Sequence, residues 1–586
     1  MFSFAGLVEL AKADQVKTDQ VKSGLVKPGL AKQRLRSINF GQLAALLLLL
    51  TIFALILLGP LISLFSKAFM TKGGDWAGLA NYTQYFKTPS LTISIGNTID
   101  ISLWSTLFSA TFGLLFAYAL TRTRMVGKLF FKYLALLPIF MPTLIHALAL
   151  VFLFGKQGII TQLGLDINLY GRTGIIIAET IYTFPQAFLM FSIALEYADG
   201  RLYEAADSMG VSPFTQFIKI TLPDIKYTAV NVLFVCFTLA FTDFGAPKVI
   251  GGSYNVLATD IYKQIVGQFD MNMGAVVGTL LLIPALLSFV VGKVTNSINA
   301  STLSSRATNF KIKKCMPRDV AFFIVCIAVS LAFLALTAAL LIGALSKYFP
   351  YDMSLSLQSF MFDSSTGGIN SFSHSLQMAI FTAVSGTVFV FIYAYLVEKS
   401  QRFSLLKKIG RLLSALPLAL PGMVIGLSFI FFFNNANNPL NIIYGTVLIL
   451  VLSNVLHYFS VPFLTATGAL KKLDSEFECV SESMGVPGYK TLLMVSAPLC
   501  LPAILEIFMY FFVNAMVTVS AVVFLYSAQF QIAAIAITHM EEAGNISQAA
   551  AMGFLILLIN VIVRILYEAA IKIVKAKLAR KEITNV

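Results

Sequence analysis

Long apolar runs alternate with short polar segments over most of the chain. About twelve of these runs reach roughly 18 to 25 residues, long enough for a helix to cross a hydrocarbon layer about 30 Å thick. They span residues 43–65, 98–120, 131–154, 174–195, 228–247, 274–297, 319–343, 374–397, 410–433, 442–466, 502–525 and 547–571. Because the runs lack the two-residue alternation of barrel strands, they favour helices. The pattern predicts an all-α polytopic membrane protein with about twelve transmembrane helices.

Composition and charge agree with this prediction. Hydrophobic residues make up 58% of the 586 residues and charged residues only 12%, which excludes an ordinary soluble domain. The net charge of +14 could indicate nucleic-acid binding in a soluble protein, but here the basic residues gather on alternate loops. The clearest clusters run from Lys12 to Arg36, Arg122 to Lys132, Arg306 to Arg318, Lys399 to Arg411 and Lys572 to Lys581. The positive-inside rule assigns these loops and both termini to the cytoplasm.

The sequence gives no sign of disulfides, a metal site or a cleaved leader. Its five cysteines are scattered without CxxC spacing, so neither a disulfide framework nor a metal cluster is indicated. A polar tail with repeated lysines precedes the first apolar run, and no small-residue cleavage pattern follows that run. We interpret this tail as a solvated or lipid-surface arm.

The chain repeats itself at a nearly constant spacing. Gly210 and Pro223 return as Gly485 and Pro498, in both cases 275 positions later. The predicted domains are a basic tail at 1–42, a first half at 43–297, a basic connector at 298–318, a second half at 319–571 and a basic C-terminus at 572–586. Each half holds six apolar runs, an even number, so the repeats are expected to lie parallel in the membrane. A translocation path is expected where the halves face each other.

The duplicated segment predicts a helix-turn-helix on the cytoplasmic side. One helix could end at Gly210, since glycine tolerates a left-handed C-cap, and another could begin with Ser212 as N-cap and Pro213 at its first position. Phe214, Phe217 and Tyr489 suit a short helix that docks into a partner's groove. The alternative is an ordinary loop between helices, which the duplication at matching topology disfavours.

These residues carry a family resemblance. Glu204-Ala205-Ala206, Gly210 and Ile220-x-Leu222-Pro223 resemble the EAA signature, EAA-x3-G-x9-I-x-LP, of permease subunits in binding-protein-dependent ABC importers. The second copy departs from it, with Cys479, Val480 and Ser481 in place of Glu-Ala-Ala, and Val495 and Ala497 in place of Ile and Leu. The resemblance implies that both loops couple to a cytoplasmic ATPase, through Glu204, Ala205, Ala206, Gly210, Phe214, Phe217, Leu222, Pro223, Glu482, Gly485, Tyr489 and Pro498. The charge contact of Glu204 is missing from the second copy unless Glu478 or Glu482 replaces it.

The resemblance also implies the partners of the chain. No G-x-x-x-x-G-K-[ST] sequence occurs, so the chain has no phosphate-cradling loop and ATP hydrolysis must be supplied in trans. The resemblance implies that the chain binds no cofactor of its own and is not itself an enzyme. Two copies of a cytoplasmic ATPase would supply ATP hydrolysis and rock the two halves between inward-open and outward-open forms. A periplasmic binding protein would deliver the solute, at the inner membrane of a bacterium.

Polar residues inside two corresponding runs are the candidates for the translocation path. Thr238, Thr242 and Asp243 lie near the outer end of the fifth run, and Asn514, Thr518 and Ser520 lie in the corresponding part of the eleventh. An ionisable group in hydrocarbon is costly and tends to face a cavity. Hydrogen bonding between helices is the alternative, since Ser, Thr and Asn commonly bond in this way in membranes.

Two Leu-Pro-x-x-x-Pro segments, at 137–142 and 416–421, lie inside the third and ninth runs. Proline removes a backbone hydrogen bond, so both segments are expected to kink their helices and shape a cavity or hinge.

The solute is the least determined feature of the sequence. A single chain with two fused halves resembles the permeases for ferric iron and for 2-aminoethylphosphonate and related phosphorus-containing anions. The segment 242–262 is most similar to the phosphonate permeases, and Lys248 and Lys263 could attract an anion near the outer mouth. Phosphonate is therefore the main expectation and ferric iron the alternative, because no carboxylate or tyrosine cluster for iron is visible in the sequence.

Two other classes are weaker alternatives. A proton-coupled secondary carrier shares the span count, but it would have charged relay residues in several spans and needs no coupling loops. An intramembrane enzyme would need a paired catalytic constellation, and none is visible.

Overall fold

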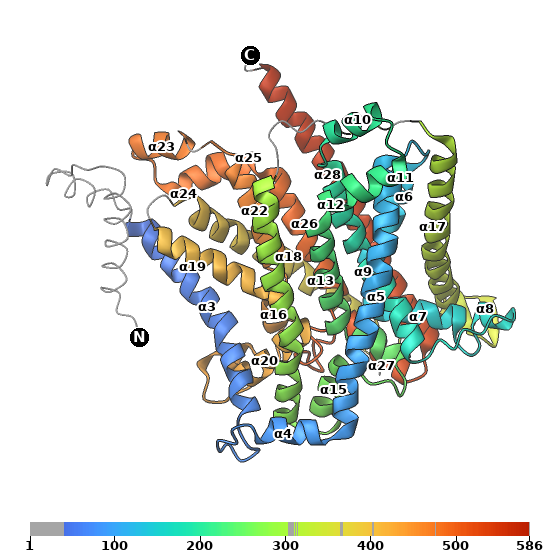
Figure 1. The fold of residues 1–586 in the computed structure, drawn as a ribbon. Helices are drawn as coiled ribbons and strands as arrows, with labels where there is room; N and C mark the ends of the chain where they lie inside the picture. Colours follow the sequence, from blue (N-terminus) through green and yellow to red (C-terminus); the bar gives the residue numbers. More distant parts are fainter. Residues whose placement is uncertain are drawn as a thin grey trace.

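The structure, a computed structural model, describes residues 40–302, 310, 312, 314–363, 367–400, 403–474 and 476–584. Almost all of the basic tail predicted at 1–42, and part of the connector at 298–318, lie outside these residues. The fold is all-α and polytopic, as the apolar pattern predicts (Figure 1).

In the part of the chain that the structure describes, eight helices are long and apolar enough to cross a membrane. The helices that contain these spans are α3 (Phe40–Ala68), α5 (Pro89–Arg122), α7 (Thr143–Phe154) with α8 (Ile159–Gln162), α9 (Arg172–Glu196), α16 (Met271–Thr302), α17 (Met316–Leu345), α18 (Gly368–Lys399) and α28 (Ile546–Thr584). Four further spans are bent pairs, which brings the total to as many as 12. The pairs are 213–224 with 226–242, 404–419 with 422–433, 447–457 with 460–471 and 488–499 with 501–517. The predicted number of spans is therefore confirmed.

The bent spans and the connecting segments are built from shorter elements. In the first half these are α4 (Ala80–Lys87), α6 (Lys128–Leu136), η1 (Leu137–Phe140), α10 (Gly200–Ser208), α11 (Pro213–Gln216), η2 (Phe217–Thr221), α12 (Leu222–Asp224), α13 (Lys226–Thr242), α14 (Gly245–Ile250), α15 (Leu257–Tyr262) and η3 (Lys263–Gly267). A small hairpin of β1 (Ser346–Tyr348) and β2 (Asp352–Leu355), then η4 (Gln358–Phe360), follows α17. The second half continues with α19 (Ser404–Ala415), η6 (Leu416–Ala419), α20 (Gly422–Phe433), η7 (Pro439–Ile443), α21 (Val447–His457), α22 (Ser460–Lys471), α23 (Glu476–Ser483), α24 (Gly488–Thr491), η8 (Leu492–Ser496), α25 (Ala497–Leu499), α26 (Leu501–Val517) and α27 (Ala533–Glu542).

Both Leu-Pro-x-x-x-Pro segments break their helices, as predicted. In each case the helix tightens into a 3₁₀ turn at the first proline, η1 or η6, and a new helix begins directly after the second proline. The second break turns the chain by 108°. Proline causes the break because it lacks the N–H that the helical ladder needs.

The first helix of each half packs against the other half. Phe53 of α3 contacts Phe459 and Tyr393, with ring centroids 4.3 and 5.4 Å apart. Phe333 of α17 meets Phe184 of α9 at 5.3 Å. In Figure 1 the blue α3 lies beside the gold helices of the second half. This exchange interlocks the halves through buried apolar surface, while the remaining helices leave a cavity between them.

Candidate functional site

The first duplicated segment folds as the predicted helix-turn-helix. Helix α10 ends with Gly210 in the left-handed region at φ +69°, and the Val211 amide donates to the Ala206 carbonyl at 3.0 Å. The next helix begins with Ser212, whose hydroxyl accepts from the Thr215 amide at 3.3 Å, and with Pro213 at its first position. A glycine is needed at position 210 because other residues pay a steric cost for positive φ.

The second copy has the same backbone. Gly485 is also at φ +69°, and the Val486 amide donates to the Ser481 carbonyl at 2.8 Å. Both copies then pass through a π-helical turn, η2 or η8, and a short helix that contains the proline of the motif. Figure 1 places the two hairpins, α10–α11 and α23–α24, at the same edge of the molecule. We call 200–224 and 476–499 the first and second coupling hairpins, after the role that the sequence predicts for them.

Most of the residues predicted to contact a partner are accessible. Phe214 and Tyr489 are 72% and 62% exposed. Accessible positions also include Glu204, Ala205, Gly210, Leu222, Pro223, Gly485 and Pro498. By contrast, Ala206 is buried and Phe217 is half-buried against the ring of Tyr118. The side chain of Glu482 lies outside the part that the structure describes.

Sequence reasoning missed a further matched pair on this surface. Met209 and Met484 precede the two glycines, and both side chains are 73% exposed. Exposed methionine provides an adaptable apolar contact. The position of both residues directly before the motif glycine was the signal that could have identified them.

The two hairpins are attached to the membrane helices by different chemistry. The Arg122 guanidinium donates to the Leu195 carbonyl at 2.9 Å and lies 4.9 Å from the Tyr203 ring and 4.0 Å from the Phe310 ring. In the second half, Lys399 donates to the Leu473 carbonyl at 3.1 Å and pairs with Glu478 at 3.1 Å. Glu478 is thus buried in an internal ion pair, so it does not replace the exposed Glu204 as a partner contact.

A cavity of about 180 Å³ lies between the two halves. Four of the residues predicted for a translocation path, Thr238, Thr242, Asp243 and Ser520, line it. The other two do not. Thr518 is buried, and the Asn514 side chain donates to the Tyr510 carbonyl of its own helix at 2.8 Å.

Asp243 is held rigidly at the wall of this cavity. It follows the last residue of α13 in an extended conformation, where Thr143 donates to one carboxylate oxygen at 2.8 Å and the Ala246 amide donates to the other at 3.0 Å. The fully buried Glu179 lies beside it. The helix break aims the carboxylate into the space between the halves and fixes its orientation.

Aromatic and imidazole groups complete the wall. Tyr182 comes from α9 of the first half. In the second half, His457 is the last residue of α21, Tyr458 follows it directly, and Tyr510 lies on α26. The rings of Tyr458 and Tyr510 meet edge to face with centroids 6.3 Å apart. Within the described part of the chain, no lysine or arginine lines this cavity. No tyrosine cluster is visible in the sequence, but three tyrosines that lie far apart in the chain line this cavity.

The ends of the spans that are predicted to face outward carry the two lysines considered as anion sites. Lys248 of the first half pairs with Glu542 of the second at 2.7 Å, and Lys263 donates to the Asn255 side chain. Both ammonium groups are therefore already engaged on the outer surface.

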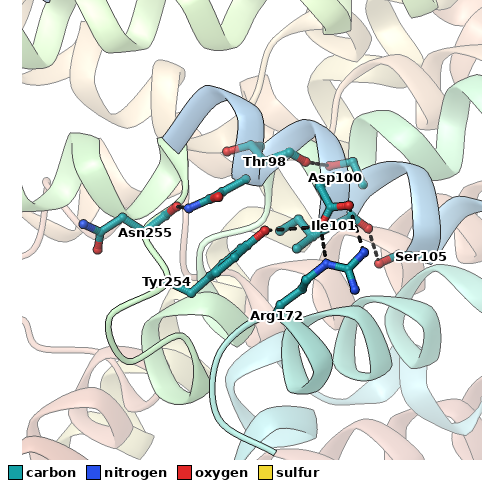
Figure 2. Close-up of polar contacts among 9 residues, drawn as sticks. Thr98, Asp100, Ile101, Ser105, Arg172, Tyr254 and Asn255 are labelled. Carbon is teal, nitrogen blue, oxygen red and sulfur yellow. Dashed lines mark hydrogen bonds and ion pairs between the residues drawn. The ribbon is translucent and has the colours of Figure 1, made fainter. Parts of the chain in front are cut away.

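A further outer cluster holds the loop that follows α14. Figure 2 shows the Arg172 guanidinium and the Tyr254 hydroxyl directed at the Asp100 carboxylate, with Tyr254 donating at 3.2 Å. Asn97 donates to the Asn255 carbonyl at 2.9 Å. The cluster connects α5, α9 and the loop, so it stabilises the first half.

Comparison with known proteins assigns both halves to one kind of protein. The family model described as "binding-protein-dependent transport system inner membrane component" matches residues 109–301 and again residues 398–574. The two matches each include one coupling hairpin and part of the wall of the cavity.

Individual relatives are more distant. The chain is 29% identical over 497 residues to "Ferric transport system permease protein FbpB" of Actinobacillus pleuropneumoniae, covering 81% of this chain and 70% of that protein. It is 28% identical to "Putative ferric transport system permease protein FbpB 1" of Haemophilus influenzae, covering 83% and 78%. A solved bacterial ABC transporter that imports the polysaccharide alginate matches 47% of this chain and 99% of its own, at 22% identity and a TM-score of 0.39.

Proposed function

This chain belongs to the family of binding-protein-dependent transport system inner membrane components, and from that premise we propose that it carries ferric iron across the membrane. The proposal replaces the phosphonate expectation with its alternative. Membership of this family also removes the reason to consider a proton-coupled carrier.

The observation that carries the proposal is the charge of the cavity between the halves. Asp243 and three tyrosines line it, and no described lysine or arginine does. Two unit charges 4 Å apart interact by about 4 kcal/mol at an effective dielectric constant near 20. A cation beside Asp243 gains energy of this order per charge, while a phosphonate anion would be repelled by a similar amount.

Two further observations support iron over phosphonate. The outer lysines that could have attracted an anion are bound to Glu542 and Asn255. The two relatives named above are both described as ferric transport permeases. The segment 242–262, which is most similar to the phosphonate permeases, contributes Thr242 and Asp243 to the cavity, whereas Lys248 and Tyr254 lie outside it.

The proposal includes the partners expected from the sequence. Two ATPase subunits would bind the coupling hairpins, and a periplasmic binding protein would release iron at the outer face. The basic loops support a cytoplasmic location for both hairpins and both termini.

Transport by the whole complex tests the proposal. We expect proteoliposomes that contain the permease and its ATPases to accumulate radioactive Fe³⁺ when an iron-loaded binding protein and ATP are supplied. The same vesicles should not accumulate 2-aminoethylphosphonate delivered by a phosphonate-binding protein. Asp243→Asn should reduce iron uptake, whereas Asp75→Asn, at an exposed carboxylate outside the cavity, should not. Uptake of phosphonate alone would overturn the proposal.

A further inference from the structure

We propose that Tyr182, Tyr458, Tyr510 and Asp243 form a transient coordination site for ferric iron that is divided between the two halves. This inference rests on the proposed function and specifies how the cavity would recognise its solute. Among the described residues, no group of three or more His, Cys, Asp or Glu is placed to hold a metal ion, so this site would depend on tyrosine oxygens.

The donor atoms match the chemistry of the ion. Fe³⁺ is a small, hard cation, and hard cations prefer anionic oxygen ligands such as carboxylate and phenolate. The cavity offers one carboxylate and three phenol groups, together with the His457 imidazole. Each tyrosine that binds as a phenolate forms one Fe–O bond and releases one proton to water in the cavity.

The carboxylate is preorganised for this role. Thr143 and the Ala246 amide hold both of its oxygens, so binding an ion does not require the side chain to be ordered first. Carboxylate oxygens have further lone pairs beyond those that accept these two bonds. The cavity is large enough for an ion with several water molecules, since a single water needs about 10–15 Å³ measured in the same way.

The division between halves provides a means of release. Asp243 and Tyr182 belong to the first half, whereas Tyr458 and Tyr510 belong to the second. When the halves rock relative to each other, the two sets of donors must separate, and an ion bound by all four loses part of its ligand set. Tight binding in one arrangement and weak binding in the next is what a transporter of a strongly coordinating ion requires.

Visible absorption of the purified complex tests the site directly. Phenolate bound to Fe³⁺ has a charge-transfer band that neither free tyrosine nor the free ion shows. We expect this band when ferric nitrilotriacetate is added to the permease with its ATPases. Apparent iron affinity should fall by at least about tenfold in each of the variants Tyr182→Phe, Tyr458→Phe and Tyr510→Phe. Tenfold is the lower limit because even residues that only support a metal ligand typically cost about 10–100-fold in affinity when they are replaced. Tyr197→Phe, at an exposed position, is the matched control and should change nothing.

The outcomes separate the two proposals. If the wild-type complex does not transport iron, the proposed function fails. If it transports iron but shows no band, and the three phenylalanine variants transport at the wild-type rate, the coordination site is wrong while the function stands. The variants retain the aromatic ring, and co-purification with the ATPases checks their assembly.

Discussion

The two coupling hairpins have the same backbone but are anchored by different side chains. Gly210 and Gly485 adopt the same φ of +69°, and the π-helical turn and proline follow at the same spacing. Beneath this shared backbone, Arg122 stacks on aromatic rings in the first half, and Lys399 forms an ion pair with Glu478 in the second. The difference teaches that the repeat preserves the shape presented to a partner, while the chemistry that supports this shape is free to change.

At the opposite ends of the spans, the two halves again share one backbone contact and differ in the side chains around it. The Leu257 amide donates to the Thr98 hydroxyl at 2.9 Å, and in the second half the Ala533 amide donates to Ser375 at 2.7 Å. Among the described residues, only the first half adds the cluster of Asp100, Arg172 and Tyr254 seen in Figure 2. Gln377, which is 277 positions after Asp100, supplies no carboxylate there. The shared bond therefore sets the loop position, and the ion pair is an addition.

Breaking the second anchor should have the largest effect. The side chains of Lys399 and Glu478 are only 9% and 10% exposed, so Glu478→Ala leaves a buried cation without its partner. Such a change typically costs about 3–5 kcal/mol. We expect a large fall in the midpoint of thermal unfolding of the solubilised complex and a loss of bound ATPase.

Two variants make this test specific. Glu476→Ala alters an exposed carboxylate on the same short helix and should have little effect. Replacing both partners, as Lys399→Met with Glu478→Leu, removes the stranded charge and should restore much of the stability. Equal stability of the Glu476 and Glu478 variants would show that the second hairpin is not held by this ion pair.

The two glycines should respond equally, with a smaller effect. Open space surrounds the position of an added Cβ at both Gly210 and Gly485, so alanine meets only the backbone cost of positive φ, about 1–2 kcal/mol. We expect Gly210→Ala and Gly485→Ala to weaken ATPase co-purification to a similar extent while membrane insertion is unchanged. A bulkier residue should abolish the association.

Gly468 provides the matched control. It also has open space around it but lies inside helix α22, where alanine is favoured by about 0.5–1 kcal/mol. Gly468→Ala should therefore be neutral or stabilising. If one hairpin tolerated alanine and the other did not, the claim that both present the same shape would be lost.

The sequence predicted features that depend on neighbouring residues. The span pattern, the left-handed glycine and the capping Ser212 were all readable because apolar continuity and turn chemistry are local. The kinks at both proline segments were predictable for the same reason. The exposure of Phe214 and Tyr489 also follows from their place in a polar loop.

The sequence could not predict contacts between distant residues. Tyr182 and Tyr458 are 276 positions apart, close to the spacing of the repeat, but the repeat alone does not show that these two positions share a cavity. Glu478 appeared available as a substitute for Glu204 because its partner Lys399 lies far away in the chain. Asn514 and Thr518 were predicted from their place in the corresponding run, but the direction of each side chain, which the sequence does not give, decides which polar residues face a cavity.

The smallest effect should come from the outer ion pair of the first half. The side chains of Arg172 and Asp100 are 47% and 35% exposed, so water screens their attraction and the pair is worth at most about 1 kcal/mol. Arg172→Ala should therefore leave transport intact but raise hydrogen exchange of the loop at 251–256 by up to about fivefold. Lys347→Ala removes an exposed ion pair with Asp352 elsewhere on the surface. This control should not change the hydrogen exchange of the loop at 251–256. The hydrogen bond from the Leu257 amide to the Thr98 hydroxyl remains in this variant. The amides of the variant loop should therefore exchange as fast as those of the corresponding loop of the second half, which precedes Ala533. A loop that unfolds entirely in the variant would mean that the ion pair, and not the repeated bond, fixes the outer end of the first half.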